Sequence, residues 1–282
     1  NDLCEVLRGS RYSANEKMQS AISDGIRLGT MLGKKLKVRN DSRDTKWTRK
    51  DSGRIDKRLI AELGFGNSRV FSTNFTDSYA DAHLHISIDA SGSMCGDKWN
   101  NTIKSSVSIC KATSMIEGLT VDVSIRYTSY QSGGRRSSER PAILMAYDSR
   151  KDKMSHIKKY WKFLGVSGTT PEGLCYQAIM DKISSGSKEK ESYFLNFSDG
   201  MPMFSNDDIK YYDTTAVGHT KKMMKEIRAK GVKVLSYYIG DSYDSNRYMG
   251  DFKKMYGKDS KFLDVTSVTA IAKSMNSKFL EK

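Results

Sequence analysis

A strand and the turn that follows it, residues 83–94 (HLHISIDASGSM), carry the clearest structural signal in the chain. From Leu84 to Ile88, apolar residues alternate with polar ones, which is typical of a β-strand. The turn Asp89–Ser93 has the spacing DxSxS, so one carboxylate and two hydroxyls can converge on one point, and Gly92 permits the bend. Hard oxygen ligands of this kind suit Mg2+. The segment therefore predicts a strand that ends in an oxygen-rich turn. Turns of this kind usually cap the next helix, so a metal site requires further oxygen ligands at the same edge of the sheet.

Strand and helix patterns alternate through the rest of the chain. Alternation of this kind predicts an α/β fold, a doubly wound and mostly parallel sheet with helices on both faces. A hairpin between the second and third strands adds one antiparallel edge strand. We expect further strands at residues 121–127, 142–147, 193–197, 232–239 and near Phe262, and helices at residues 99–110, 151–164, 171–183, 217–227 and 268–279.

The first 80 residues have a different pattern. Ser13–Leu36 predicts an amphipathic helix with a capping box of Ser13 and Glu16. Residues 37–80 lack a clear period, with one short helix expected at Ile55–Leu63. We therefore divide the chain into a helical extension with a basic linker, residues 1–80, and an α/β domain, residues 81–282. The helix is expected to pack through apolar residues at helical spacing, namely Met18, Ile22, Ile26 and Met31.

The chain is strongly basic, with 47 Lys and Arg against 33 Asp and Glu and a formal net charge of +14. Half of this surplus lies between Lys34 and Arg58, where eleven basic residues accompany four acidic ones. Such a charge favours anionic partners, and we interpret this run as a solvated linker in preference to a nucleic-acid arm. The loop Tyr127–Arg140 is a second candidate for nucleic-acid binding, because aromatic and Arg side chains can stack on bases and contact phosphate. The residues concerned are Tyr127, Tyr130, Arg135, Arg136 and Arg140.

Several function classes lack their sequence signatures. The chain has no apolar run long enough for a membrane span and no secretory leader, so a cytoplasmic protein is expected. Neither GxGxxG, GxxxxGK[ST] nor a nucleophile elbow occurs, so we expect no nucleotide binding and no catalysis by this chain alone. The cysteines have no spacing for zinc or a disulfide framework; they are Cys4, Cys95, Cys110 and Cys175.

His83 and His85 form an HxH pair on one face of the first strand, an arrangement that metal-dependent amidohydrolases use for ligands. The pair lies at the start of the strand, however, at the end opposite Asp89. We therefore interpret both as hydrogen-bonded structural histidines.

Two further segments place oxygen atoms at the sheet edge where the DxSxS turn lies. The strand at residues 193–197 runs into Ser198 and Asp199, and a loop with Thr169 and Thr170 precedes Pro171, which opens a helix. Ligands of open α/β sheets lie at the carboxyl ends of the strands. We therefore expect a Mg2+ site, with Mn2+ or Ca2+ as alternatives, made by Asp89, Ser91, Ser93, Thr170 and Asp199.

This set resembles the metal-ion-dependent adhesion site of von Willebrand factor A (VWA) domains, which uses DxSxS, a distal Thr and a distal Asp in that order. The resemblance implies that Ser91 and Ser93 are direct hydroxyl ligands. It also implies that Asp89 and Asp199 act mainly through water.

The threonine ligand has two candidates. VWA domains usually have two glycines before it, whereas here Gly168 is followed by Thr169. Thr169 is therefore an alternative ligand, and Thr170 is preferred because it directly precedes Pro171.

A wider pattern is similar to the C-terminal half of CobT, the VWA subunit of the aerobic cobalt chelatase, and to versions in bacteriophages. It rests on Ser52–Asp56 (SGRID), Asp89–Met94 (DASGSM) and Ser198–Pro202 (SDGMP). The resemblance implies a non-catalytic protein whose metal binds an acidic residue of an AAA+ ATPase that remodels a client. A cobaltochelatase subunit and a basic nucleic-acid-binding protein are the alternatives.

Overall fold

The computed structural model describes residues 16–40, 43–77, 81–131, 138–183, 186, 190–240, 242–257 and 260–264. A six-stranded sheet with the order β11-β10-β7-β4-β5-β6 forms the centre. All neighbouring strands are parallel except the β5–β6 hairpin. The expected fold class, with its single antiparallel edge strand, is confirmed. The strands are β4 (Asp81–Asp89), β5 (Leu119–Gln131), β6 (Ser138–Asp148), β7 (Lys190–Ser198), β10 (Val232–Gly240) and β11 (Ser260–Asp264).

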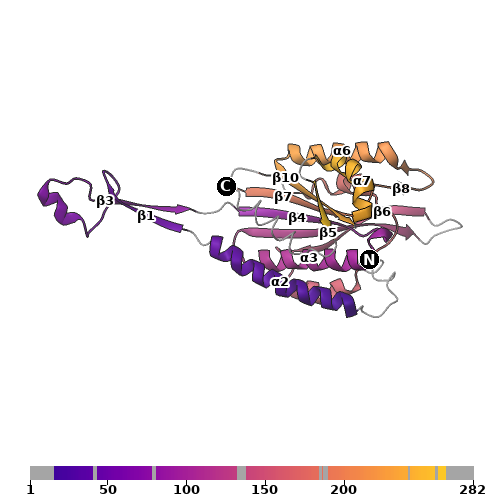
Figure 1. The fold of residues 1–282 in the computed structure, drawn as a ribbon, viewed down its shortest axis with the longest axis horizontal. Helices are drawn as coiled ribbons and strands as arrows, with labels where there is room; N and C mark the ends of the chain where they lie inside the picture. Colours follow the sequence, from indigo (N-terminus) through magenta and orange to yellow (C-terminus); the bar gives the residue numbers. More distant parts are fainter. Residues whose placement is uncertain are drawn as a thin grey trace.

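Helices cover both faces of this sheet (Figure 1). On one face, apolar side chains of β4 and β5 pack with Ile22, Ile103 and Ile157. On the other face, Phe194 and Val234 belong to a second cluster with side chains of three further helices. The first face is covered by α2 (Glu16–Asn40), α3 (Asp97–Thr113) and α4 (Met154–Tyr160), and the second by α5 (Glu172–Ile179), α6 (Asp213–Ala229) and α7 (Ser242–Tyr256).

Helix α2 packs along α3 through a stripe of glycines. A Cβ atom at Gly25, Gly29 or Gly33 would lie only 2.7, 2.4 or 2.8 Å from the nearest atom of α3 or of Met115 just beyond it. Met18 and Ile22 are buried as expected, but Met31 is 56% exposed and does not belong to the packing face. The prediction for Met31 was wrong because α2 contacts α3 through the face that carries Gly25, Gly29 and Gly33, and Met31 does not lie on that face.

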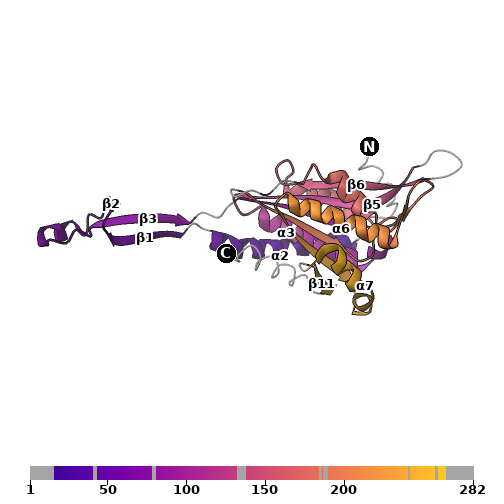
Figure 2. The ribbon, with the colours of Figure 1, turned by 90° about the horizontal axis from the view of Figure 1, so that it is seen from above.

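Residues 43–77 form an arm that projects away from the body, as Figures 1 and 2 show. The linker without regular structure that the sequence analysis expected is instead a small antiparallel sheet with the order β1-β3-β2. The short helix is a 3-10 turn and begins later than the expected Ile55–Leu63. Cross-strand pairing, which a one-dimensional pattern does not display, decides this difference. The elements are β1 (Arg43–Lys50), β2 (Arg54–Ile55), η1 (Ile60–Phe65) and β3 (Phe71–Asp77).

Other differences concern helix bounds. The helix expected at residues 151–164 is α4 followed by the 3-10 turn η3 (Trp161–Phe163), and α5 ends at Ile179. Helix α7 and the two-residue strands β8 (Phe204–Ser205) and β9 (Lys210–Tyr211) were not anticipated. The capping residue Ser13 and the expected helix at 268–279 lie outside the described residues. No helix among the described residues has the length and apolarity that crossing a membrane requires.

Candidate metal centre

Four of the five predicted site residues meet at the carboxyl edge of β4 and β7. Ser91 Oγ lies 3.0 Å from Ser93 Oγ, and Ser93 Oγ donates to Asp199 Oδ1 at 2.8 Å. The backbone N–H of Ser91 donates to Asp89 Oδ1 at 2.9 Å, which folds the turn back on its own carboxylate. Ser198 Oγ donates to Asp89 Oδ2 at 3.2 Å and so joins the ends of the two strands. Side chains 106 and 109 positions apart are thus brought together by parallel strand pairing.

The loop that carries the threonines lies against the DxSxS turn. The backbone N–H of Gly92 donates to the Gly168 carbonyl at 3.0 Å, and that of Ser167 donates to the Ala90 carbonyl at 2.7 Å. Thr170 is buried, and its carbonyl accepts from the Met203 N–H. The Thr169 hydroxyl is also buried and has no hydrogen-bond partner. Both threonines therefore remain candidates for the loop ligand.

The site oxygens lie at ordinary hydrogen-bond distances, which are also compatible with neighbouring ligands of an octahedral magnesium ion. Ligands that lie about 2.1 Å from Mg2+ at right angles are about 3 Å apart. The Ser91–Ser93 and Ser93–Asp199 distances of 3.0 and 2.8 Å match neighbouring positions of such a shell. Among the described residues, no three His, Cys, Asp or Glu side chains gather as a metal site. The ligand set consequently depends on hydroxyl groups.

The site has a buried acid and a nearby ammonium group. Burial raises the pKa of Asp89 to about 7, with Glu172 and Asp199 adding to the rise and Arg126 opposing it. Lys98 Nζ, on α3, lies 3.0 Å from Asp199 Oδ2. The sequence analysis did not identify Lys98, although its position one turn after DxSxS places it beside the site. This lysine balances the negative charge of Asp199.

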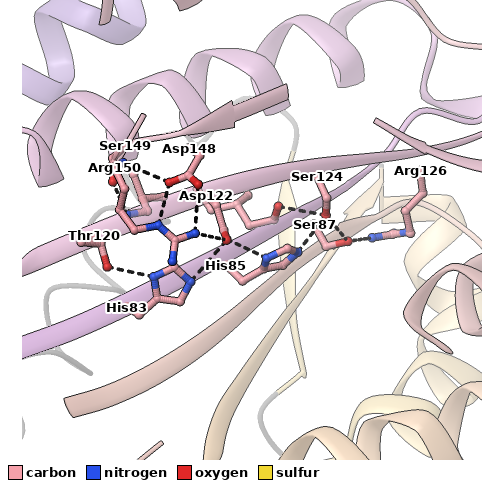
Figure 3. A network of polar contacts seen from close by, with 12 residues as sticks. His83, His85, Ser87, Thr120, Asp122, Ser124, Arg126, Asp148, Ser149 and Arg150 are labelled. Atoms are coloured by element: carbon pink, nitrogen blue, oxygen red, sulfur yellow. Dashed lines mark hydrogen bonds and ion pairs between the residues drawn. The ribbon is translucent and has the colours of Figure 1, made fainter. Parts of the chain in front are cut away.

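The histidine pair belongs to a buried polar network at the other end of the sheet (Figure 3). His85 Nδ1 lies 2.6 Å and His83 Nε2 lies 3.4 Å from the Asp122 carboxylate. Their other ring nitrogens are 2.8 Å from the hydroxyls of Thr120 and Ser124. Burial opposes ionisation of Asp122, but the two histidines outweigh it and hold its pKa below the ordinary value. Both histidines are therefore buried and hydrogen-bonded, as the sequence analysis expected.

A buried ion pair connects this polar face of the sheet to the threonine loop. Arg126 on β5 donates to Ser87 Oγ at 2.6 Å and to Glu172 Oε1 at 3.1 Å. The same Glu172 oxygen accepts from Tyr176 and Asn196. Glu172 stands two residues after Thr170, so these contacts anchor the loop to the sheet. The alternation of polar residues from Thr120 to Thr128 in a central strand was the sequence signal for this network.

The aromatic and arginine loop after Tyr127 is only partly within the described residues. Tyr127 is buried in the main core, so the expectation that it stacks on bases is wrong. Residues 132–137, which include Arg135 and Arg136, lie outside the described residues. Of the cysteines, Cys95 is exposed and free, while Cys110 and Cys175 are buried and free.

Comparisons with known proteins concern the arrangement of helices and strands. No protein-family model and no curated protein sequence matches the chain. The pilus adhesin SpaC from Lactobacillus rhamnosus GG, in its open conformation, is similar with a TM-score of 0.49 and 12% identity over 73% of this chain and 30% of that one. The SpRpn10 VWA domain has a TM-score of 0.43 and 13% identity over 70% and 95% of the two chains. Human COPII-coat protein Sec24c has a TM-score of 0.43 and 9% identity over 71% and 32%. The chain thus spans about a third of the length of SpaC and Sec24c.

Proposed function

We propose that this chain is a Mg2+-dependent protein-binding module of the VWA type. Asp89, Ser91, Ser93, Asp199 and one threonine of the adjoining loop would hold the ion, and Mn2+ or Ca2+ would fill the same position. The observation that carries the proposal is the pair of oxygen distances that link Ser91, Ser93 and Asp199, 3.0 and 2.8 Å. The order of these residues along the chain, which resembles the adhesion site of VWA domains, supports it independently.

The chemistry of the site favours an acidic partner. A Mg2+ ion held by neutral hydroxyls and two carboxylates supplies a Lewis-acidic position that a partner's Asp or Glu can fill. The net charge of +14 steers acidic surfaces toward the chain over long distances. Coordination of a partner carboxylate requires no covalent bond to be made or broken, so the proposed role is binding rather than catalysis.

The resemblance to CobT-like proteins suggests that the partner is an AAA+ ATPase ring of the chelatase or remodelling type. In this proposal the ring presents the acidic residue and uses ATP-driven motion to remodel a client. A cobaltochelatase subunit is the alternative, and it would use the same site. Corrin-biosynthesis genes beside this gene would favour the alternative, whereas a solitary AAA+ gene would favour general remodelling.

Titration calorimetry with MgCl2 tests the metal site directly. Asp89→Asn and Ser91→Ala are each expected to weaken Mg2+ binding by about tenfold or more, because each removes a group that holds the ion. Ser114→Ala is the matched control, since Ser114 is exposed at the end of α3 and its hydroxyl bonds only the Lys111 carbonyl. Thr169→Val and Thr170→Val, which keep the shape of the side chain, identify the loop ligand. Equal binding by the wild type and the Asp89 and Ser91 variants would exclude the site.

Pull-down of an AAA+ ATPase encoded beside this gene tests the partner. Binding is expected in MgCl2 and not in EDTA, and Asp89→Ala or Ser91→Ala should abolish it while the far-ultraviolet circular dichroism spectrum is unchanged. Retention of the ATPase by these folded variants would refute metal-dependent binding of the ATPase. The Ser114→Ala protein again provides the control.

A further inference from the structure

The arm of residues 43–77 lies at the end of the molecule opposite the metal centre, because β4 starts at Asp81 beside the arm and ends at Asp89 (Figures 1 and 2). Its strands pair with one another and not with the central sheet. Val70 is its one buried apolar residue among those described. A three-stranded sheet with so little core is marginal by itself. The arm is therefore built to present side chains outward rather than to enclose a core.

Ion pairs stabilise the arm, and each of them uses one of its acidic side chains. The two carboxylate oxygens of Glu62 accept hydrogen bonds from the two terminal guanidinium nitrogens of Arg49, at 3.0 and 3.1 Å. Arg58 pairs with Asp56 at 3.1 Å, and Arg69 pairs with Asp51 at 3.3 Å. The acids of the outer arm are thus already neutralised by arginines.

Several exposed basic side chains of the arm take no part in these ion pairs. Lys50, Arg54 and Lys57 are exposed, and no carboxylate lies within ion-pair distance of them in the described part of the chain. Lys50 Nζ lies 5.2 Å from the ring centroid of Trp47, which is itself 54% exposed. The sequence of β1, RDTKWTRK, has four basic residues, whereas that of β3, FSTNFTD, has none. Among the described side chains of the arm, the basic ones without an ion-pair partner therefore lie on both edges of the ribbon, Lys50 on β1 and Arg54 on β2, and in the turn after β2, at Lys57.

The tip of the arm is apolar and open. Ile55, Ile60, Leu63 and Phe65 are all exposed, and Phe65 reaches 91%. A Cβ atom added at Gly64 or Gly66 would meet no atom within 4 Å. The tip consequently presents large apolar side chains with nothing packed on them.

We propose that the arm binds double-stranded DNA, with Lys50, Arg54 and Lys57 at the phosphate backbone and Phe65 inserted at a base step. A β-ribbon fits a DNA groove, and apolar wedges at base steps are a recurrent means of groove binding. A membrane surface would meet the tip alone. DNA explains both the exposed basic side chains and the apolar tip, and it requires no metal.

Fluorescence anisotropy with a 30-base-pair duplex tests this proposal on the full chain. The variant Lys50→Gln/Arg54→Gln/Lys57→Gln is expected to bind at least tenfold more weakly, and its salt dependence should be shallower by about three in log–log slope, one for each lost phosphate contact. Phe65→Ser should weaken binding without changing that slope, because the wedge is uncharged. Trp47 should become protected from acrylamide quenching on binding, since Trp99 and Trp161 are already buried.

The matched control removes three charges elsewhere. Lys221, Lys225 and Lys253 are exposed on α6 and α7, and their replacement by Gln should weaken binding no more than threefold. EDTA and Asp89→Asn should leave DNA binding unchanged, which separates this inference from the metal-dependent function. Equal weakening by both triple variants, no DNA binding at 50 mM NaCl, or Phe65-dependent binding only to vesicles of phosphatidylserine and phosphatidylcholine would overturn the proposal.

Discussion

In the proposed metal site Asp89 faces competing demands, since it is buried and would have to be ionised to help hold a cation. Its pKa of about 7 in the folded protein lies above its value of about 3.9 in the unfolded chain. As pH rises from about 4 to 7, the metal-free folded state therefore binds more protons than the unfolded state and loses stability through this group. Protons and Mg2+ compete for the same carboxylate.

We accordingly expect MgCl2 to raise the melting temperature much more at pH 8 than at pH 5.5. Differential scanning calorimetry at the two pH values measures this. In Asp89→Asn the pH dependence of the magnesium effect should largely disappear. A magnesium effect that is equal at both pH values in the wild type would show that Asp89 does not exchange a proton for the ion.

Lys98 supplies a tethered positive charge to the same site. Its ammonium group lies 3.0 Å from Asp199 and would compete with the proposed Mg2+ ion for that carboxylate. We expect Lys98→Met, which keeps the length of the side chain, to bind Mg2+ several-fold more tightly by calorimetry. Lys104→Met is the control on the same helix, because Lys104 pairs with Asp24 instead. Weaker magnesium binding by Lys98→Met would mean that the lysine supports the site rather than competing for it.

At the scale of elements, the glycine stripe of α2 sets its distance from α3. A Cβ at Gly29 would lie 2.4 Å from the Ser108 carbonyl oxygen, so Gly29→Ala must push the helices apart. We expect a loss of about 1–3 kcal/mol in the free energy of unfolding, measured by urea denaturation. Gly218→Ala in α6 is the matched control: with no atom near its Cβ, it should stabilise the protein by up to about 1 kcal/mol. Equal effects at the two positions would refute close α2–α3 packing.

The elements also show which periodicities were informative. The sequence predicted several elements correctly, because an element buried on one face has apolar residues that recur with a period of 2 in a strand or 3.6 in a helix. These elements are strands β4, β5, β7 and β10 and helices α3 and α6. The arm has almost no core, so burial left no such period in residues 43–77. The close contact of α2 was missed for a related reason, because glycines at positions 25, 29 and 33 carry no hydrophobic signal.

At the scale of the whole molecule, the arm and the body are separate in construction. Arg43 and Asp77 are paired at the base of the arm, so a short Gly-Ser linker can replace residues 43–77. We expect this deletion to shift the melting temperature of the body by only a few degrees, because no described side chain of the arm belongs to the two main core clusters. The deleted protein should still bind Mg2+. A collapse of the body's unfolding transition would show that the arm is required for folding.

The sequence by itself determined the α/β class and the central strand, and it predicted the oxygen-bearing residues of the candidate site, because alternation, turn glycines and side-chain types are local properties of the chain. Tertiary structure alone decided that Ser93 bonds Asp199, that Lys98 stands beside them and that Arg126 and Glu172 anchor the threonine loop. These contacts join residues 46 to 106 positions apart, and only the parallel pairing of strands and the packing of helices on them place such side chains within a few ångströms.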